Sequence, residues 1–379
     1  MLKVNDRDFI DKDFKDSYSI IKKSQKILVW GDEDADGITS TIIILRTLNT
    51  LGKKAHYFIP SRIKDGIGLV ERKVDLFLKK DFDTFITVDC ASVNYELIKK
   101  IKLSDKNIIV TDHHIPYKKK VEKVPYINPY LLSSKKFKNL SGSGVSFIFS
   151  LYLLKKFKIV KDYSQSFFYD PFNISLAAVG TKCDKVKVDK TNEKILKYYN
   201  GIFYHIPFLR ELEFDETNLC GVFANSKTLS FKNPLVEYIL KENYKKSFYL
   251  FLKDAKRKIE NYKKRIEKYL NEIEKKSFEK EKYILIVKKN IEYKYTGVLA
   301  SLLSKKYDKP VCIIGKKGKN FGGECRFDSE NFNWLDTLKL FENYFIGFGG
   351  HKKAAGFEIN SERIYEFVNE FNNRLNSSK

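Results

Sequence analysis

The feature that most constrains the fold is a series of short apolar segments that alternate with helical patterns over the first third of the chain. These largely apolar segments lie at residues 26–30, 56–59, 85–89 and 108–112. Apolar side chains recur at helical spacing in residues 37–51, and residues 94–101 predict a second helix. Apolar strands joined by helices are typical of a parallel sheet that helices cover on both faces. The sequence therefore predicts an α/β domain built on a parallel sheet.

Acidic residues or histidines follow three of these predicted strands. The stretch GDEDADGITS (31–40) comes directly after the first strand, Asp89 closes the third, and Asp112-His113-His114 closes the fourth. The loops beyond the carboxyl ends of parallel strands converge on one crevice of an open sheet. We therefore expect residues about 80 positions apart in the sequence to share one site.

The first acidic stretch places carboxylates at alternate positions, Asp32, Asp34 and Asp36. Carboxylates this close disfavour each other's ionisation unless a cation lies between them. An EF-hand calcium loop is excluded, because its twelfth position from Asp32 would be Ile43 instead of glutamate and a strand-like segment precedes it. One aspartate would be enough to cap the helix that follows, so three indicate a cation site.

The histidine pair points to the same chemistry. The chain has five histidines, and two of them, His113 and His114, are adjacent. Asp89 and Asp184 add further carboxylates, although each alone would be read as a cap or surface residue. Oxygen and imidazole ligands without thiolate suit Mn²⁺, Mg²⁺ or Zn²⁺. Together these side chains suffice for two metal ions about 3.5–4 Å apart, an arrangement that hydrolyses phosphate esters.

The second half of the chain has a different pattern. An amphipathic stripe without Gly or Pro runs from residue 243 to 273 and predicts a long connecting helix. A smaller α/β domain is expected after it, with strands at 283–287 and 311–315, a helix at 297–307, and glycine-rich turns at 321–327 and 347–357. The predicted boundaries are 1–215 for the first domain, 216–279 for the helical connector and 280–379 for the C-terminal domain.

Charge and cysteine content bear on partners and location. The formal net charge is +23, from 71 Lys and Arg against 48 Asp and Glu. This surplus suits nucleic acid or an anionic membrane surface, but AT-rich coding would also produce it. Five cysteines without a CxxC pair favour a reducing compartment and mostly structural thiols. Without a signal-peptide pattern or a membrane-spanning apolar stretch, we expect a cytoplasmic protein with no membrane partner.

These motifs resemble those of the DHH phosphoesterases, and within them the RecJ-like single-strand nucleases. The family signature is Asp-His-His, here at 112–114, and GDEDADGITS, VDCAS (88–92) and AAVGTKCD (177–184) look like its first, second and fourth motifs. Weaker similarity to RecJ-like chains is found in IPSRIKDGIGL (59–69), INPY (127–130) and LSGSGVSF (140–147). GVLASLLSKKYDKPVCII, GGECRF and GGHKKAAGF resemble the DHH-associated C-terminal domain. The implied fold is a parallel-sheet DHH domain joined by a long helix to a smaller α/β domain.

The resemblance also implies roles for individual residues. The metal ligands would be Asp34, Asp36, Asp89, His113 and Asp184, with Asp89 as the bridge. Asp32 would be a catalytic-site carboxylate, either behind the metal ligands or an alternate ligand itself, and His114 would face the scissile phosphate. The C-terminal domain would contact the substrate through Arg326, Gly349, Gly350 and His351. The implied cofactor is a pair of Mn²⁺ ions, with Mg²⁺ as the alternative.

Two departures from the family pattern shape the functional expectation. Trp30 stands where many relatives have a metal-binding histidine, and the chain ends at residue 379 without the oligonucleotide-binding barrel of bacterial RecJ. It is thus similar to a short, archaeal-type RecJ relative.

The expected function is removal of nucleotides from single-stranded DNA or RNA in an interdomain cleft, with replication or repair proteins as further partners. The alternatives are a nanoRNase or small-nucleotide phosphodiesterase, and a replisome component that binds the replicative helicase machinery.

Overall fold

A computed structural model describes residues 3–62, 64–116, 120–228, 232–241 and 245–376. The chain divides into two compact units, Met1–Ile259 and Glu260–Lys379, and each is described by itself. The three-part division predicted from the sequence stays a prediction beside this two-unit division.

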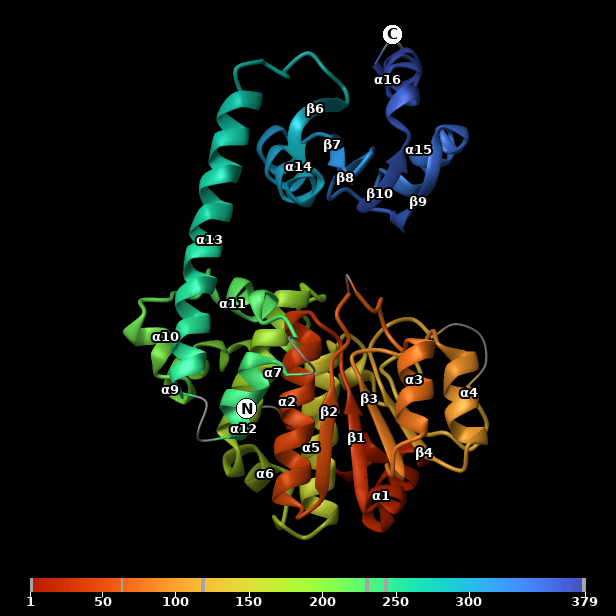
Figure 1. The fold of residues 1–379 in the computed structure, drawn as a ribbon, viewed down its shortest axis with the longest axis vertical. Helices are drawn as coiled ribbons and strands as arrows, with labels where there is room; N and C mark the ends of the chain where they lie inside the picture. The colour runs from red at the N-terminus through yellow and green to blue at the C-terminus, as the bar shows by residue number, and fades with distance from the viewer. Residues whose placement is uncertain (1–2, 63, 117–119, 229–231, 242–244, 377–379) are drawn as a thin grey trace. The chain divides into compact units, whose positions relative to one another are not determined.

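The first unit is built on a five-stranded parallel sheet (Figure 1). Its strands, in the order β2-β1-β3-β4-β5, are β2 (Lys54–Phe58), β1 (Lys26–Trp30), β3 (Thr84–Val88), β4 (Asn107–Thr111) and β5 (Tyr126–Ile127). The parallel sheet predicted from the apolar segments is confirmed, with strand ends within two residues of the expected ones. β5 was not predicted, because two residues are too few to show a periodic pattern.

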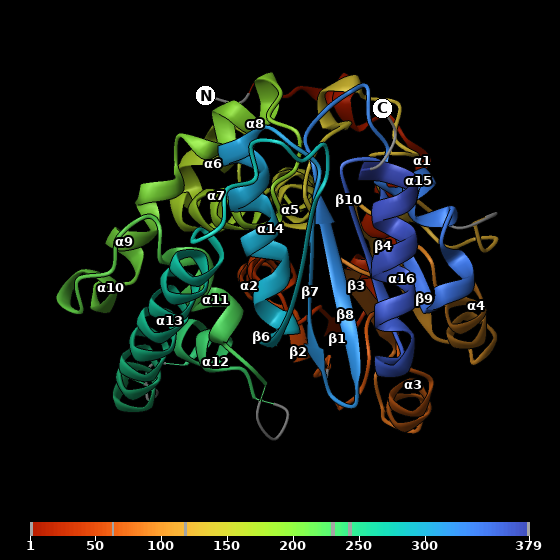
Figure 2. The same cartoon turned by 90° about the horizontal axis from the view of Figure 1, so that it is seen from above.

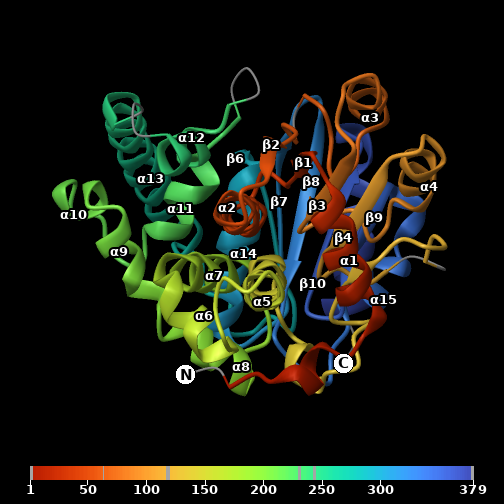
Figure 3. The same ribbon diagram turned by 90° about the horizontal axis from the view of Figure 1, so that it is seen from below.

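Helices cover both faces of this sheet (Figure 3). One face carries α2 (Ala35–Thr50), α5 (Gly142–Lys156) and α7 (Pro171–Asp184), and the other carries α3 (Glu71–Leu78) and α4 (Tyr95–Leu103). Successive side chains along each strand point to opposite faces of the pleated sheet. In β1, Ile27 and Val29 are buried with α2, α5 and α7, whereas Leu28 and Trp30 are buried with α3 and α4. Strands buried on both faces explain why the segments are apolar throughout.

The strand order reverses between β1 and β3, and this fixes where a site can lie. β2 pairs with one side of β1 and β3 pairs with its other side, so the chain leaves the ends of β1 and β3 in opposite directions. In open α/β sheets such a reversal leaves a crevice beyond the carboxyl ends of the two strands. Both acidic motifs begin there, GDEDADG after β1 and Asp89 after β3.

Smaller helices surround this framework. They are α1 (Lys12–Lys23), α6 (Tyr163–Tyr169), α8 (Lys190–Leu196), α9 (Ile202–His205), α10 (Phe208–Glu211), α11 (Leu219–Asn225) and α12 (Pro234–Leu240). The long predicted helix is confirmed as α13 (Lys245–Ile273), while its first two predicted residues, 243 and 244, lie outside the described residues. Among the described helices, none is long and apolar enough to cross a membrane.

The second unit contains a mixed five-stranded sheet between two helical layers (Figure 2). Its strands, in the order β6-β7-β8-β10-β9, are β6 (Ile284–Glu292), β7 (Val311–Lys317), β8 (Asn320–Arg326), β10 (Ala354–Ile359) and β9 (Phe345–His351). Helix α14 (Tyr293–Tyr307) packs on one face, and α15 (Trp334–Lys339) and α16 (Ile364–Phe371) pack on the other. Only β6 and β7 are parallel, and α14 connects them.

The first glycine-rich segment, 321–327, is almost entirely strand β8, which corrects the turn expected there, whereas the second, 347–357, contains a turn at 352–353 that joins β9 to β10. Glycine weakens strands and is usually read as a turn signal. Here aromatic rings pack directly against the strand backbone: a Cβ on Gly323 would lie 2.2 Å from the Phe357 ring, and one on Gly322 would lie 2.3 Å from the Tyr293 ring. The glycines therefore make room for neighbouring side chains.

We expect Gly323→Ala to destabilise the second unit by about 1–3 kcal/mol, the usual cost of overpacking a core. Urea unfolding of the full chain measures this change. The matched control is Gly347→Ala in β9, where a Cβ would have no neighbour within 4 Å. Equal stability of the two variants would contradict the packing explanation.

Candidate metal centre

The predicted ligands from four separate elements converge around the imidazole of His113. Its Nε2 atom lies 3.2 Å from Asp89 Oδ1, 3.6 Å from Asp184 Oδ2 and 3.9 Å from Asp36 Oδ2. Asp36 is in the first turn of α2, Asp89 follows β3, His113 follows β4, and Asp184 ends α7. The structure thus brings together residues that are up to 148 positions apart in the sequence. A second group, Asp32, Asp34 and Asp89, has its ligand atoms within 4.8 Å of one another.

Two atoms at the centre of this cluster have no hydrogen-bond partner. Asp89 Oδ1 and His113 Nε2 are both buried and unsatisfied among the described residues. Burial, followed by the charges of Asp36 and Asp34, raises the pKa of Asp89 well above its usual range. Buried polar atoms nearly always have a partner, and a carboxylate among carboxylates needs a positive charge to stay ionised. The donor set and the two unsatisfied atoms therefore fit a divalent cation.

Asp36 is held rigidly by the start of α5. Its two oxygens accept hydrogen bonds from the main-chain N–H groups of Gly142, at 2.6 Å, and Ser143, at 3.0 Å. Glycine is needed where the helices approach the carboxylates: a Cβ on Gly142 would lie 2.2 Å from Asp89 Oδ1, and one on Gly180 would lie 2.3 Å from Asp36 Oδ1. Sequence reasoning gave these glycines no role, although the segments LSGSGVSF and AAVGTKCD contained the signal.

The turn after β3 has an unusual backbone. Asp89 has φ 58° and Ala91 has φ 89°, both in the left-handed region. Aspartate tolerates this conformation at modest cost, whereas alanine rarely adopts it. Strain of this kind persists only where surrounding contacts enforce it, and it is concentrated at functional sites. The turn directs the Asp89 side chain into the cluster, with only 2% of it exposed.

Arg62 supplies part of the positive charge that the first acidic stretch requires. Its Nε donates to Asp32 Oδ1 at 3.1 Å and its Nη2 donates to Asp34 Oδ2 at 2.8 Å. The same carboxylates raise the pKa of Arg62 above its already high usual value. Asp34 also caps α2, since its Oδ1 accepts the N–H of Gly37 at 2.9 Å. Sequence reasoning missed Arg62 as a site residue, although IPSRIKDGIGL had been noted.

Asp112 orients the second histidine of the motif. Its buried Oδ1 lies 2.8 Å from His114 Nδ1, and its Oδ2 accepts the N–H of Ser92 at 2.8 Å. The hydrogen bond to Asp112 raises the pKa of His114 to about 9. Asn128 completes the arrangement, because its side-chain amide donates to the His114 carbonyl oxygen at 2.9 Å. The His114 ring is thereby fixed at one nitrogen, while its side chain remains 55% exposed.

Trp30 does not take part in the centre. It is fully buried on the face of α3 and α4, where its ring packs edge-on against Phe58 and its Nε1 donates to the Gly68 carbonyl oxygen at 3.1 Å. The position where many relatives have a histidine is thus used for core packing.

The predicted substrate contacts of the second unit lie at one end of its sheet. Arg326 in β8 and His351 in β9 both pair with Ala354 of β10, from opposite sides. The Arg326 guanidinium contacts Glu324 Oε2 at 2.8 Å, whereas His351 is exposed. Gly349 and Gly350 precede His351 in the same exposed edge strand. The four predicted residues are therefore neighbours in the sheet.

Two family models match the chain. Residues 26–170 match the DHH family, N-terminal domain, and residues 280–377 match the DHHA1 domain. Among curated proteins, the single-stranded-DNA-specific exonuclease RecJ of Bacillus subtilis is 25% identical, over 98% of this chain and 49% of its own length. The protein of the same name from Haemophilus influenzae is 27% identical, over 92% of this chain and 66% of its own length. The chain thus spans less than two thirds of these relatives.

Solved structures support the fold. A crystal structure of exonuclease RecJ bound to manganese matches with a TM-score of 0.74 at 22% identity, covering 94% of this chain and 92% of that one. RecJ from Thermus thermophilus in complex with Mn²⁺ also gives a TM-score of 0.74, at 21% identity, covering 96% of this chain and 54% of that one. At this identity the likeness shows a common two-unit α/β fold.

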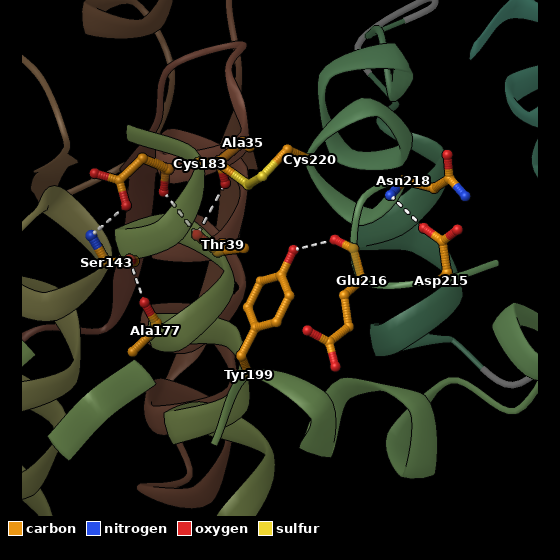
Figure 4. Close-up of a disulfide and its surroundings, with 11 residues drawn as sticks. Ala35, Thr39, Ser143, Ala177, Cys183, Tyr199, Asp215, Glu216, Asn218 and Cys220 are labelled. Atoms are coloured by element: carbon orange, nitrogen blue, oxygen red, sulfur yellow. Dashed lines mark hydrogen bonds between the residues drawn. A yellow bond between two sulfur atoms is a disulfide. The ribbon is translucent and has the colours of Figure 1, made fainter. Parts of the chain in front are cut away.

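A disulfide joins α7 to α11 (Figure 4). Cys183, in the last turn of α7 next to Asp184, is bonded to Cys220 in α11. This corrects the unpaired thiols expected from the sequence for two of the five cysteines. The two lie 37 positions apart, and the packing of α7 against α11, which no local pattern reveals, brings them together. Cys90, Cys312 and Cys325 are buried free thiols.

We expect Cys220→Ser to lower the free energy of unfolding by about 4 kcal/mol, the chain-entropy value for a loop of this size. Cys183→Ser should have the same effect, and the double variant should lose no more. Urea unfolding under non-reducing conditions measures the loss, and wild-type protein treated with a dithiol reductant should behave like the variants. Five titratable thiols in unreduced, unfolded wild type, instead of three, would contradict the bond.

Proposed function

This chain is a member of the DHH family, with a DHH N-terminal domain and a DHHA1 domain, and we propose that it is a metal-dependent phosphodiester hydrolase. Its substrate would be single-stranded DNA or RNA, from which it removes nucleotides. The curated relatives are named for this activity on single-stranded DNA. The net charge of +23 favours a polyanionic substrate in the same way.

The observation that carries the proposal is the pair of unsatisfied atoms, Asp89 Oδ1 and His113 Nε2, 3.2 Å apart in a buried cluster of carboxylates. The two atoms lie within ion-pair distance of each other, yet neither makes a hydrogen bond among the described residues, and a cation would serve both as a partner. Two divalent ions would be held by Asp34, Asp36, Asp89, His113 and Asp184, with Asp89 shared between them. Mn²⁺ suits this mixed shell of carboxylate and imidazole better than Mg²⁺, which prefers oxygen ligands alone. When bound, such a pair lowers the pKa of a water molecule and offsets the charge of a phosphate.

The remaining residues of the site hold its side chains in position, and one of them, His114, would contact the substrate. Asp112 fixes His114 through Nδ1, so that Nε2 is free to donate a hydrogen bond to a phosphate oxygen. Asp32, held by Arg62, keeps the first acidic loop in place. The main-chain N–H groups of Gly142 and Ser143 hold Asp36 before any metal arrives, which reduces the reorganisation that metal binding requires.

The second unit would bind the neighbouring phosphates of the same strand. Arg326 provides a planar guanidinium suited to bidentate phosphate recognition. Gly349 and Gly350 lack side chains, so their backbone allows an anion to approach closely, and His351 adds an exposed donor. A cytoplasmic location, and replication or repair proteins as partners, belong to the same proposal.

The alternatives from the sequence differ in measurable ways. A nanoRNase would hydrolyse a dinucleotide faster than a 20-mer, whereas a strand exonuclease would favour the longer substrate. A purely structural replisome component would show no hydrolysis with any metal. Single strands of DNA and RNA, labelled at either end and digested with Mn²⁺, separate these outcomes and give the direction of cleavage.

We expect Asp89→Ala to abolish hydrolysis and to weaken Mn²⁺ binding, because the side chain would touch both ions. A product ladder on labelled single strands and calorimetric titration with Mn²⁺ provide two independent readouts. Asp75→Ala, which removes a partly exposed carboxylate of α3 paired with Lys100, is the control and should keep both properties. Full turnover by Asp89→Ala, or wild-type turnover in excess chelator, would rule out the two-metal site.

Arg326→Ala and His351→Ala should each raise KM for an oligonucleotide about tenfold or more, the effect of losing a charge-assisted hydrogen bond. Their Mn²⁺ affinity should be unchanged, because neither residue is a proposed ligand. Arg363→Ala, which removes an exposed arginine of the same unit paired with Glu366, is the matched control. If both variants show wild-type kinetics, the second unit does not bind the substrate.

A further inference from the structure

Asp184 is the least anchored of the carboxylates that surround His113. Its side chain is 28% exposed, whereas the side chains of Asp36 and Asp89 are each 2% exposed. Main-chain amides hold Asp36, but the Asp184 carboxylate accepts no hydrogen bond from any described residue and lies 3.6 Å from His113 Nε2. The position of this ligand therefore depends on the backbone at the end of α7.

That end of α7 emerges from the core just before the ligand. The helix is buried from Phe172 to Thr181, and Asp184 is its last residue. Lys185, which follows, has φ 59° and ends the helix. The final turn of a helix has carbonyl groups without intrahelical partners, and it frays more readily than the interior. A ligand in this turn is held less firmly than one inside a helix.

The disulfide between Cys183 and Cys220 restrains this turn (Figure 4). Cys183 directly precedes Asp184 in the sequence, so the covalent bond acts one residue away from the ligand. Its other end lies in α11, a helix 37 positions further along the chain. The bond thus ties the end of α7 to a separate element.

Helix α11 is a firm anchor for the bond. On either side of Cys220, Leu219 and Val222 are fully buried in the core of the first unit. The Tyr199 hydroxyl donates to the Glu216 carbonyl oxygen at 2.8 Å and holds the segment that leads into α11 (Figure 4). These contacts do not involve the disulfide, so α11 stays in place when the bond is broken.

Both bonded cysteines are partly exposed, whereas the three free cysteines are buried. A dithiol reductant can therefore attack one sulfur of the disulfide through its thiolate, and its second thiol then displaces the protein sulfur. The S–S bond breaks, two protein thiols form, and the reductant leaves as its own disulfide. Two electrons and two protons pass from the reductant to the protein.

We propose that the Cys183–Cys220 disulfide positions Asp184 for metal binding, and that its reduction to two thiols weakens the hold on the ion. The inference rests on the proposed metal centre and adds to it two positioning residues outside the ligand set. Without the bond, the last turn of α7 has to become ordered when the ion binds, and that ordering is subtracted from the affinity. Loss of a group that orients a metal ligand costs about 10–100-fold in affinity.

The effect is confined to one part of the metal centre. Two of the groups whose ligand atoms lie close enough together to hold an ion are Asp36, His113 and Asp184, and Asp32, Asp34 and Asp89. Only the first group contains the residue beside the disulfide. Reduction should therefore weaken the binding of one ion and leave the other, whereas unfolding of the first unit would abolish both.

The experiment is calorimetric titration of the full chain with Mn²⁺, in the oxidised form and after reduction by a dithiol that is then removed without air. We expect two binding events in both forms, one of them weakened about tenfold or more by reduction. Cys220→Ser should match the reduced protein and no longer respond to the reductant. Asp184→Asn, which keeps the disulfide, should bind Mn²⁺ equally in both forms. Circular dichroism before each titration establishes that the protein is folded.

A second test follows from reciprocity. If the disulfide strengthens Mn²⁺ binding, Mn²⁺ must make the disulfide harder to reduce by the same factor. Alkylation of Cys183 and Cys220 in mixtures of reduced and oxidised dithiol, followed by mass spectrometry, measures this with saturating Mn²⁺ and without metal. Equal Mn²⁺ affinity of the two forms, or an unchanged redox dependence in Asp184→Asn, would overturn the proposal and leave the metal centre in place. If neither form binds Mn²⁺, the metal centre itself is ruled out, and the proposal with it.

Discussion

Mutual repulsion among carboxylates is the constraint around which the first unit is organised. Asp34, Asp36, Asp89 and Asp184 meet within a few ångströms, and bringing such charges together out of water is costly unless positive groups compensate. Fixed hydrogen-bond donors offset part of this cost, since the α5 amides hold Asp36 and the Arg62 guanidinium holds Asp34. What these donors leave uncompensated is the charge that a metal would balance.

The sheet topology makes this concentration of charge achievable. The reversal of strand order between β1 and β3 opens space at their carboxyl ends, and each acidic motif begins where a strand stops. Buried polar contacts then tie the loops to one another, since Asp112 holds both Ser92 and His114 and Asn128 holds the His114 carbonyl. A fully satisfied network of this kind rigidifies its members. The ligands are thus placed by elements that do not move independently.

Much of this arrangement could be predicted from the sequence, because local patterns encode it. The apolar segments predicted the sheet, and the acidic and histidine residues that follow them predicted that Asp36, Asp89 and His113 lie together. The rest depends on contacts between distant segments. In the sequence Arg62 is indistinguishable from a surface arginine, and only the folded loop brings it to Asp32. Cys183 and Cys220 meet only because their helices pack together. The glycines of β8 resemble turn residues, and only the packing of Phe357 against them explains why they lie in a strand.

Arg62 already pairs with Asp34, one of the carboxylates proposed to hold a metal ion. Its guanidinium hydrogen-bonds an oxygen of Asp34, so a metal ion held by that carboxylate would have to compete with Arg62 for it. The free energy needed to release that hydrogen bond is subtracted from the intrinsic affinity for the metal. Without a metal ion, Arg62 offsets part of the negative charge of Asp32 and Asp34. A metal ion that displaced Arg62 from Asp34 would leave the guanidinium available to bind another anion.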